Sequence, residues 1–385
     1  MFKKALLVFI SLRIIGILFT FNIFNKLQRG YGDARFLIGG VNLRDADLSL
    51  PFFANTTTFN YAILNFLPDG LILASIILTF ITSTIIWKNL KNFLITKNSS
   101  LLWIAIFIPS YCVHTILPSK EATFISLSLI YICFEANNII FKPVNQWNNI
   151  SLFFQRFLYI FLFLLVRGLG SAPYIFLGFF VTLFPFISPF LMKYKNNKVN
   201  IFIFLSISSI FTLLIIFIIS SFENQYLVDQ SLYLKGSFLQ AEGSNTSREY
   251  LLNRDTFSLG NYFLLFPYLS LFPTIQELLT NPKLIFYVID SSIYIGLYFI
   301  AWNKVINIAF MHPRKIKFFQ YLFIIITITY ILIYGTIGAF NLGSSLRFRQ
   351  NFTNIGLIFP LIIFYNSKKS KNIFLSKSLK DTQSI

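Results

Sequence analysis

The chain has 385 residues, of which 56% are hydrophobic and only 12% are charged. An average soluble domain carries about 25% charged residues, so the composition excludes an ordinary soluble domain. The formal charge of +18 would suggest nucleic-acid binding in a soluble protein. In a membrane protein, basic residues collect in cytoplasmic loops instead, and we therefore expect no nucleic-acid partner.

Ten apolar runs predict an all-α polytopic membrane protein that forms a single transmembrane domain over residues 1–385. Several of the runs approach the ~20 residues that a helix needs to cross a bilayer. The predicted helices cover about 5–24, 69–87, 101–117, 122–141, 152–170, 173–192, 200–221, 284–303, 318–340 and 352–366. The last run is short for a span, so we expect its helix to begin near Arg347 or the bilayer to thin locally.

The charges between the runs predict the orientation. Lys3 and Lys4 precede the first run and no small-residue cleavage site follows, which favours a retained helix over a cleaved signal peptide. With these lysines inside, every short loop agrees with one topology. Both termini are then cytoplasmic, residues 367–385 form a basic cytoplasmic tail, and residues 25–68 and 222–283 form two long outer loops.

Arginine and lysine are distributed differently on the two sides. Of the 18 basic residues in the predicted cytoplasmic segments, 17 are lysine, whereas eight of the 12 in the outer segments are arginine. The planar five-donor guanidinium suits bidentate binding of phosphate or carboxylate. The bias indicates an anionic ligand on the outer side, with local ion pairs to loop acids as the alternative.

The two long outer loops carry four candidate residues. In the first loop, the carboxylate of Asp33 can accept a proton from a substrate hydroxyl, or it can pair with Arg35. In the second loop, Arg248 and Arg254 each stand beside an acid in sequence. Adjacent residues on a helix do not face one another, so both arginines remain candidate ligands for an anion.

The predicted hairpin between the third and fourth helices contains His114, Ser119, Lys120 and Glu121. Ser119 can cap the next helix, and Glu121 in its first turn fits that interpretation. Lys120 opposes the helix dipole, which makes it a candidate anion ligand with Glu121 as a base or an orienting group. His114 lies one turn deeper, where we expect a hydrogen-bonded interior residue.

Arg167 ends the fifth predicted helix and is followed by Gly168 and Gly170. Glycines allow close approach of the backbone, and exposed amides beside an arginine suit a phosphate. A tight turn with Arg167 extended toward lipid headgroups is the alternative.

Three ionisable residues, Arg13, Arg156 and Asp290, stand within the apolar runs. Such residues are functional candidates by default. Arg13 and Arg156 lie nearer the cytoplasmic half, where a bundle-stabilising pair or snorkelling is the simpler interpretation. Asp290 lies nearer the outside and can pair with one of the loop arginines.

Arg347 and Arg349 stand two residues apart before the last run. On a helix this spacing separates two side chains by about 200°, whereas on extended backbone both point the same way. The preceding Gly343-Ser-Ser favours irregular backbone, so we expect both guanidiniums to converge on one pyrophosphate. Lipid-headgroup binding is the alternative.

The chain has two cysteines, Cys112 and Cys133, both in apolar runs, and two histidines. This count predicts neither a disulfide framework nor a metal site. We accordingly expect no cofactor.

The architecture resembles that of the O-antigen and capsular-polysaccharide polymerases, the Wzy-like bacterial inner-membrane proteins. The resemblance covers the whole chain: ten or more helices, both ends inside, and a large late outer loop with arginines. It includes three short strings, Gly32-Asp-Ala-Arg35, Pro118-Ser-Lys-Glu121 and Ser345-Leu-Arg-Phe-Arg-Gln-Asn351.

The resemblance implies a metal-independent glycosyltransferase in the inner membrane, with periplasmic outer loops. Such an enzyme moves a glycan carried on undecaprenyl pyrophosphate onto another lipid-linked repeat unit, in company with a flippase and a chain-length regulator. Its catalytic residues would be Asp33, Glu121, Arg347 and Arg349, with either carboxylate as the base. The residues that bind the pyrophosphate or the glycan would be Arg35, Lys120, Arg167, Arg248 and Arg254.

Two other functions stay open. A GT-C-type glycosyltransferase uses a polyprenyl-phosphate sugar and keeps an acid in the first outer loop, where Asp33 fits, but a monophosphate needs fewer arginines. A flippase for lipid-linked oligosaccharides would line a central cavity with cations through the bilayer depth.

Overall fold

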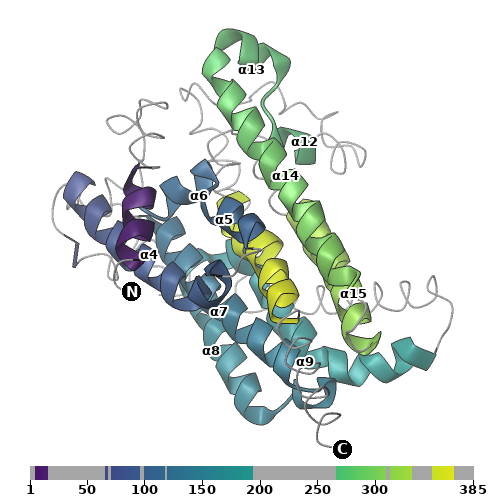
Figure 1. The fold of residues 1–385 in the computed structure, drawn as a ribbon. Coiled ribbons are helices and arrows are strands. Elements are labelled where there is room, and N and C mark those ends of the chain that lie inside the picture. The colour runs from purple at the N-terminus through teal and green to yellow at the C-terminus, as the bar shows by residue number, and fades with distance from the viewer. Residues whose placement is uncertain are drawn as a thin grey trace, which may run out of the picture.

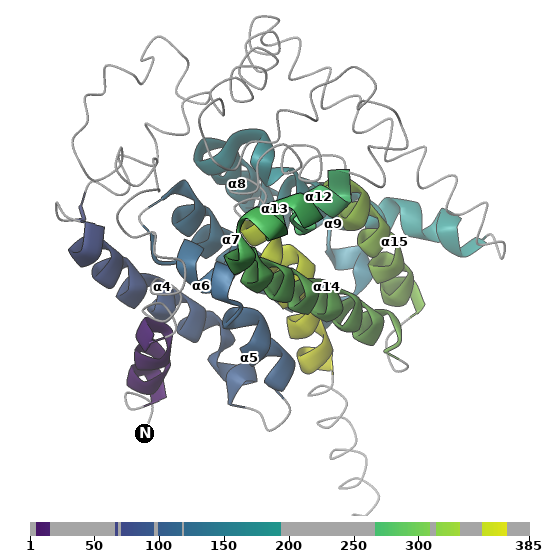
Figure 2. The ribbon, with the colours of Figure 1, turned by 90° about the horizontal axis from the view of Figure 1, so that it is seen from above.

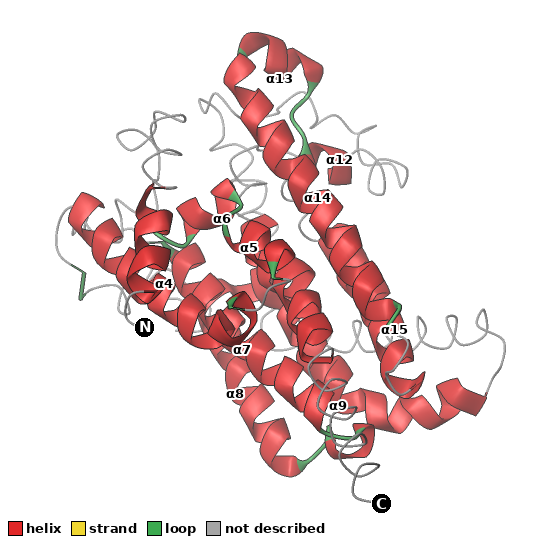
Figure 3. Ribbon diagram, in the orientation of Figure 1, coloured by secondary structure: helices red, strands yellow, loops and turns green. Residues whose placement is uncertain are grey.

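The structure, a computed structural model, describes residues 5–15, 66–67, 71–95, 99–117, 119–193, 266–308, 313–331 and 349–367. Every regular element in these ranges is helical (Figure 3). Five of the helices described are long and apolar enough to cross a membrane: α4 (Leu71–Leu94), α7 (Lys120–Phe141), α8 (Ile150–Arg167), α9 (Ala172–Lys193) and α14 (Ile285–Ile306). The all-helical architecture is confirmed. The count of ten spans, the two long outer loops and the cytoplasmic tail stay predictions, because much of that chain lies outside the described residues.

Shorter helices complete the described bundle. They are an N-terminal helix (Ala5–Ile15), α5 (Ser100–Ile106), α6 (Pro109–His114), α12 (Phe266–Leu271), α13 (Ile275–Thr280), α15 (Pro313–Thr329) and a C-terminal helix over residues 349–367, with 3₁₀ turns η2 (Val144–Gln146), η3 (Gly168–Ser171) and η7 (Pro282–Leu284). The C-terminal helix includes a π-helical segment, η9 (Asn354–Ile358).

The predicted single helix over 101–117 is wrong, because the chain forms two short helices there. Ile108 adopts a non-helical conformation (φ −53°, ψ 123°) and Pro109 begins α6. A proline disfavours helical geometry in the residue before it and cannot donate a backbone hydrogen bond. The break separates α6 from α5, and the second residue of α6, Ser110, donates to Asp290 of α14.

The C-terminal helix lies in the middle of the bundle. It runs between α5, α7 and α14 in both views (Figures 1 and 2), and all but one of its described residues are buried. Its polar side chains therefore must find partners within the protein. The amide of Asn354 donates to the carbonyl of Ile125 (2.7 Å) and the hydroxyl of Ser128 (2.8 Å) on α7, and accepts from Tyr111 of α6 (2.9 Å).

Aromatic side chains and one buried ion pair hold the other helices together. Phe318 of α15 stacks on Phe180 of α9 with ring centres 5.0 Å apart. Arg156 of α8 binds both carboxylate oxygens of Glu135 on α7 (2.7 and 3.0 Å). Of the two interpretations offered for Arg156, the bundle-stabilising pair is confirmed.

Candidate functional site

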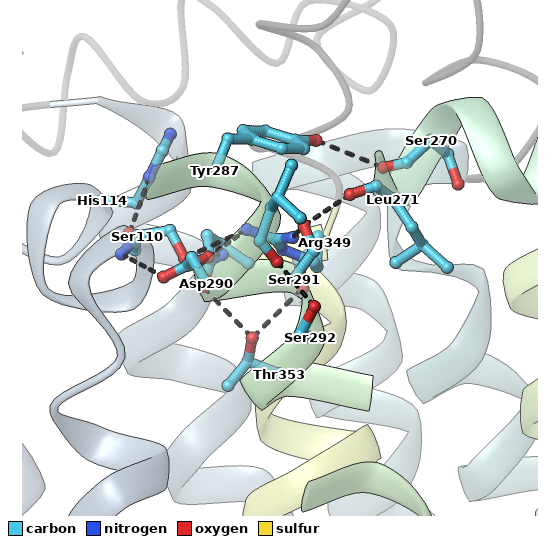
Figure 4. Close-up of polar contacts among 12 residues, drawn as sticks. Ser110, His114, Ser270, Leu271, Tyr287, Asp290, Ser291, Ser292, Arg349 and Thr353 are labelled. Carbon is cyan, nitrogen blue, oxygen red and sulfur yellow. Dashed lines mark hydrogen bonds and ion pairs between the residues drawn. The ribbon is translucent and has the colours of Figure 1, made fainter. Parts of the chain in front are cut away.

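A buried pair between Arg349 and Asp290 lies at the centre of the candidate site (Figure 4). Arg349 is the first described residue of the C-terminal helix and is fully buried, while Asp290 belongs to α14. The guanidinium also donates to the hydroxyl of Ser291. It lies near the rings of Tyr287 and Tyr294, at 5.1 and 5.4 Å from their centres, where cation–π attraction adds to the ion pair.

Gln350 connects this pair to α6. Its amide nitrogen donates to the hydroxyl of Ser110 (2.7 Å). Ser110 in turn donates to Asp290 from its hydroxyl (2.6 Å) and from its backbone N–H (3.3 Å). Unlike Arg349, Ser110 is partly exposed, so it marks the edge from which a ligand could approach the pair.

Asn351 connects the same turn to α8 and α7. With its amide oxygen facing Arg167, Asn351 accepts from the guanidinium at 2.9 and 3.1 Å. Arg167 also pairs with Glu121 at 3.0 Å, and both side chains are buried. The backbone carbonyl of Asn351 accepts from the hydroxyl of Tyr174 on α9 (2.6 Å).

Three consecutive residues thus bind three different parts of the bundle, and the polar groups that they bring together form what we call the arginine cluster. The arginine cluster consists of Ser110, Glu121, Arg167, Asp290, Arg349, Gln350 and Asn351. Its residues come from the first turns of α6 and α7, the last residue of α8, the N-terminal part of α14 and the first described turn of the C-terminal helix. It contains two arginines and two carboxylates, so its formal charge is balanced.

Of the nine site residues that the sequence predicts, Glu121, Arg167 and Arg349 come together in the arginine cluster. Lys120, at the start of α7, is half-buried. The other five, Asp33, Arg35, Arg248, Arg254 and Arg347, lie outside the described residues. The convergence of Arg347 with Arg349 therefore stays a prediction.

Two conformations differ from those that the sequence predicts. Arg349 lies on helical rather than extended backbone, and its guanidinium binds Asp290. Ser119 stands at the start of α7 but gives no side-chain cap. A capping box needs the acid at the third helical position, whereas Glu121 is at the second and pairs with Arg167 instead.

Other expectations are confirmed. Asp290 does pair with one of the arginines expected in an outer segment, Arg349, although that arginine lies in the last helix, and His114 is a hydrogen-bonded interior residue whose Nδ1 lies 2.9 Å from the carbonyl of Ser110. Arg167 does not extend toward lipid headgroups. Its side chain folds back over the turn, where a Cβ on Gly170 would lie 3.0 Å from the Cγ of Arg167.

The sequence interpretation missed Ser110, Gln350 and Asn351 as members of the site. Their positions in the sequence could have identified them. Ser110 follows the proline that breaks an apolar run, and Gln350 and Asn351 directly follow the candidate residue Arg349. Within the described ranges, no three metal-binding side chains come together.

The comparisons with known proteins returned no match, whether to protein-family models, curated proteins or solved structures. The fold and the site together define only a class. The protein is all-helical in its described part, has helices suited to a membrane, and holds a buried, charge-balanced cluster of arginines and carboxylates at one end.

Proposed function

We propose that the protein is a membrane glycosyltransferase that polymerises lipid-linked oligosaccharide repeat units on the outer side of a bacterial inner membrane. One observation supports this proposal above all. Residues 349–351 link two arginine–carboxylate pairs, Arg349–Asp290 and Arg167–Glu121, that come from separate helices, and such paired cations suit the handling of a diphosphate. Cations scattered over the rim would have argued against it.

The chemistry of such a transfer uses both kinds of charge. The acceptor hydroxyl oxygen attacks the anomeric carbon of the donor glycan, the bond from that carbon to the phosphate oxygen breaks, and the lipid diphosphate leaves. A carboxylate takes the hydroxyl proton, and guanidiniums stabilise the charge that develops on the diphosphate. Undecaprenyl pyrophosphate carries the donor, and the chain works beside a flippase and a chain-length regulator.

The ion pairs of the arginine cluster fit a resting state of this reaction. Asp290 and Glu121 occupy guanidiniums that a diphosphate could bind. When a phosphate takes the place of a carboxylate on Arg349 or Arg167, that carboxylate becomes free to accept a proton. Either Glu121 or Asp290 can act in this way, alongside Asp33 of the first outer loop.

The test is the surface polysaccharide of a deletion strain that carries plasmid-borne variants. We expect the deletion and Arg349→Ala to leave single repeat units on the lipid-A core and to abolish long chains, seen as loss of the ladder on a gel. Arg156→Met is the matched control, because it removes an equally buried, carboxylate-paired arginine outside the cluster.

Protein levels in the membrane are measured for each variant by immunoblot. A normal ladder with Arg349→Ala would show that the arginine cluster is not the polymerase site. A deletion strain with no repeat at all would indicate a flippase, and one that lacks a side branch would indicate a GT-C-type transferase.

A further inference from the structure

The short helix α6 lies between two buried arginines. It has only six residues, Pro109–His114, and a helix of this length has no stability of its own in isolation. Its position therefore depends on the groups that hold its two ends. One end carries Ser110 into the arginine cluster, so the placement of α6 decides the geometry of that cluster.

At its first turn, α6 is held by Asp290. The backbone N–H and the hydroxyl of Ser110 donate to the two oxygens of this carboxylate at 3.3 and 2.6 Å. The same carboxylate pairs with Arg349. A shift of α6 would therefore remove two of the hydrogen bonds that orient Asp290.

At its last turn, α6 is held by Arg13 from the N-terminal helix. The guanidinium donates to the hydroxyl of Thr115, the residue that follows α6, and to Ser83 (3.0 Å) and Thr82 (3.4 Å) on α4. The hydroxyl of Thr115 in turn donates to the backbone carbonyls of Cys112 (2.9 Å) and Tyr111 (3.1 Å), both in α6. Arg13 is therefore connected to the last turn of α6 through Thr115. A cation is favourable at the carbonyl end of a helix.

Arg13 differs from the other fully or nearly buried arginines. Arg156, Arg167 and Arg349 each pair with a carboxylate, whereas Arg13, within the described ranges, donates to three hydroxyl groups and interacts with the thiol of Cys112. Its side chain is fully buried. Taking a cation out of water is costly, and among the described residues the Arg13 guanidinium is compensated by three hydroxyls and by the carbonyl end of α6.

We propose that Arg13 is a positioning residue that fixes α6 and so holds Ser110 against Asp290 in the arginine cluster. The contacts place Arg13 at one end of α6 and the Asp290–Arg349 pair at the other. Loss of the guanidinium frees Thr115 and allows α6 to move away from α4. The consequence for catalysis rests on the proposed function, whereas the consequence for α6 does not.

The chain contains its own reporter for this movement. Cys112 lies on α6 and is 2% exposed, and the only other cysteine, Cys133, is on α7. In a Cys133→Ala background, we would measure the rate at which N-ethylmaleimide labels Cys112 in membranes. The variants are Arg13→Met, Arg13→Lys as the charge-conserving rescue, and Arg156→Met as a control that disrupts a buried pair away from α6.

We expect Arg13→Met to raise the labelling rate at least tenfold and to shorten the polysaccharide ladder. Arg13→Lys should restore protection of Cys112 at least in part, and Arg156→Met should leave the rate unchanged. Thermal unfolding of each variant in detergent shows whether the fold survives.

Two results would overturn the proposal. One is wild-type labelling of Cys112 in a folded Arg13→Met protein. The other is an equal increase with Arg156→Met, which would indicate general loosening. If labelling rises as expected while neither the deletion nor Arg349→Ala alters the polysaccharide, Arg13 positions α6 and the polymerase function is wrong.

Discussion

At the scale of single residues, Arg349 shows how a buried charge is accommodated. Its guanidinium binds one carboxylate and two hydroxyls and lies within cation–π distance of two tyrosine rings. Removing one partner of a buried pair leaves the other without compensation, whereas removing both can be far milder. Asp290 and Arg349 should therefore show strong coupling in stability.

We expect Asp290→Ala to lower the free energy of unfolding by about 3–5 kcal/mol. The double variant Asp290→Leu/Arg349→Met should be more stable than Asp290→Ala alone, because no unpaired charge remains. Unfolding in mixed micelles of rising SDS content measures the free energy of unfolding of each variant. Asp290→Leu and Arg349→Met complete the double-mutant cycle, and a loss in the double variant equal to the sum of these two single losses would show that the residues are not coupled.

At the scale of elements, the π-helical segment of the C-terminal helix adapts this helix to its neighbours. A π-helical turn has i→i+5 hydrogen bonds, which widen the helix locally, and such turns are frequent at functional sites. The carbonyl of Gly356 accepts from the indole N–H of Trp302 on α14 (2.9 Å). A Cβ on Gly356 would lie 2.7 Å from the ring of Phe352 and 3.4 Å from the hydroxyl of Tyr294, so only glycine fits there.

We expect Gly356→Ala to destabilise the protein by about 1–3 kcal/mol through overpacking. Gly296→Ala is the matched control on α14, because a Cβ there meets nothing within 4 Å. Alanine is the better helix former, so this change should be neutral or stabilising by up to about 1 kcal/mol. The comparison uses the same SDS titration, and equal losses at both sites would contradict the close packing at Gly356.

At the scale of the whole molecule, the orientation in the membrane decides which side the arginine cluster faces. The lysine-rich loops predict that the cluster opens to the outer side. We expect alkaline phosphatase fused after residue 97 or 195 to be inactive, and the same reporter fused after residue 170 to be active. Green fluorescent protein at these positions should give the reverse pattern. Active phosphatase after residue 97 would invert the topology and move the cluster to the cytoplasmic face.

The sequence by itself predicted a membrane protein, most helix positions within the described residues, and the charged residues worth testing. Apolar runs and basic loops are local properties of the chain, and so are the charges placed within or beside a run. Local signals also had limits. The helix expected over 101–117 overlooked the effect of Pro109, and Ser119, which was expected to cap α7, gives no side-chain cap.

Only the tertiary structure decided which charges meet. Arg349 and Asp290 are 59 residues apart in the chain. Arg167 at the end of α8 pairs with Glu121 at the start of a different helix, α7. Such contacts depend on how the helices pack and on how each buried polar group is satisfied by its neighbours. An apolar run predicts that a helix will be buried in a membrane or a bundle, but not which neighbour its few polar side chains will face.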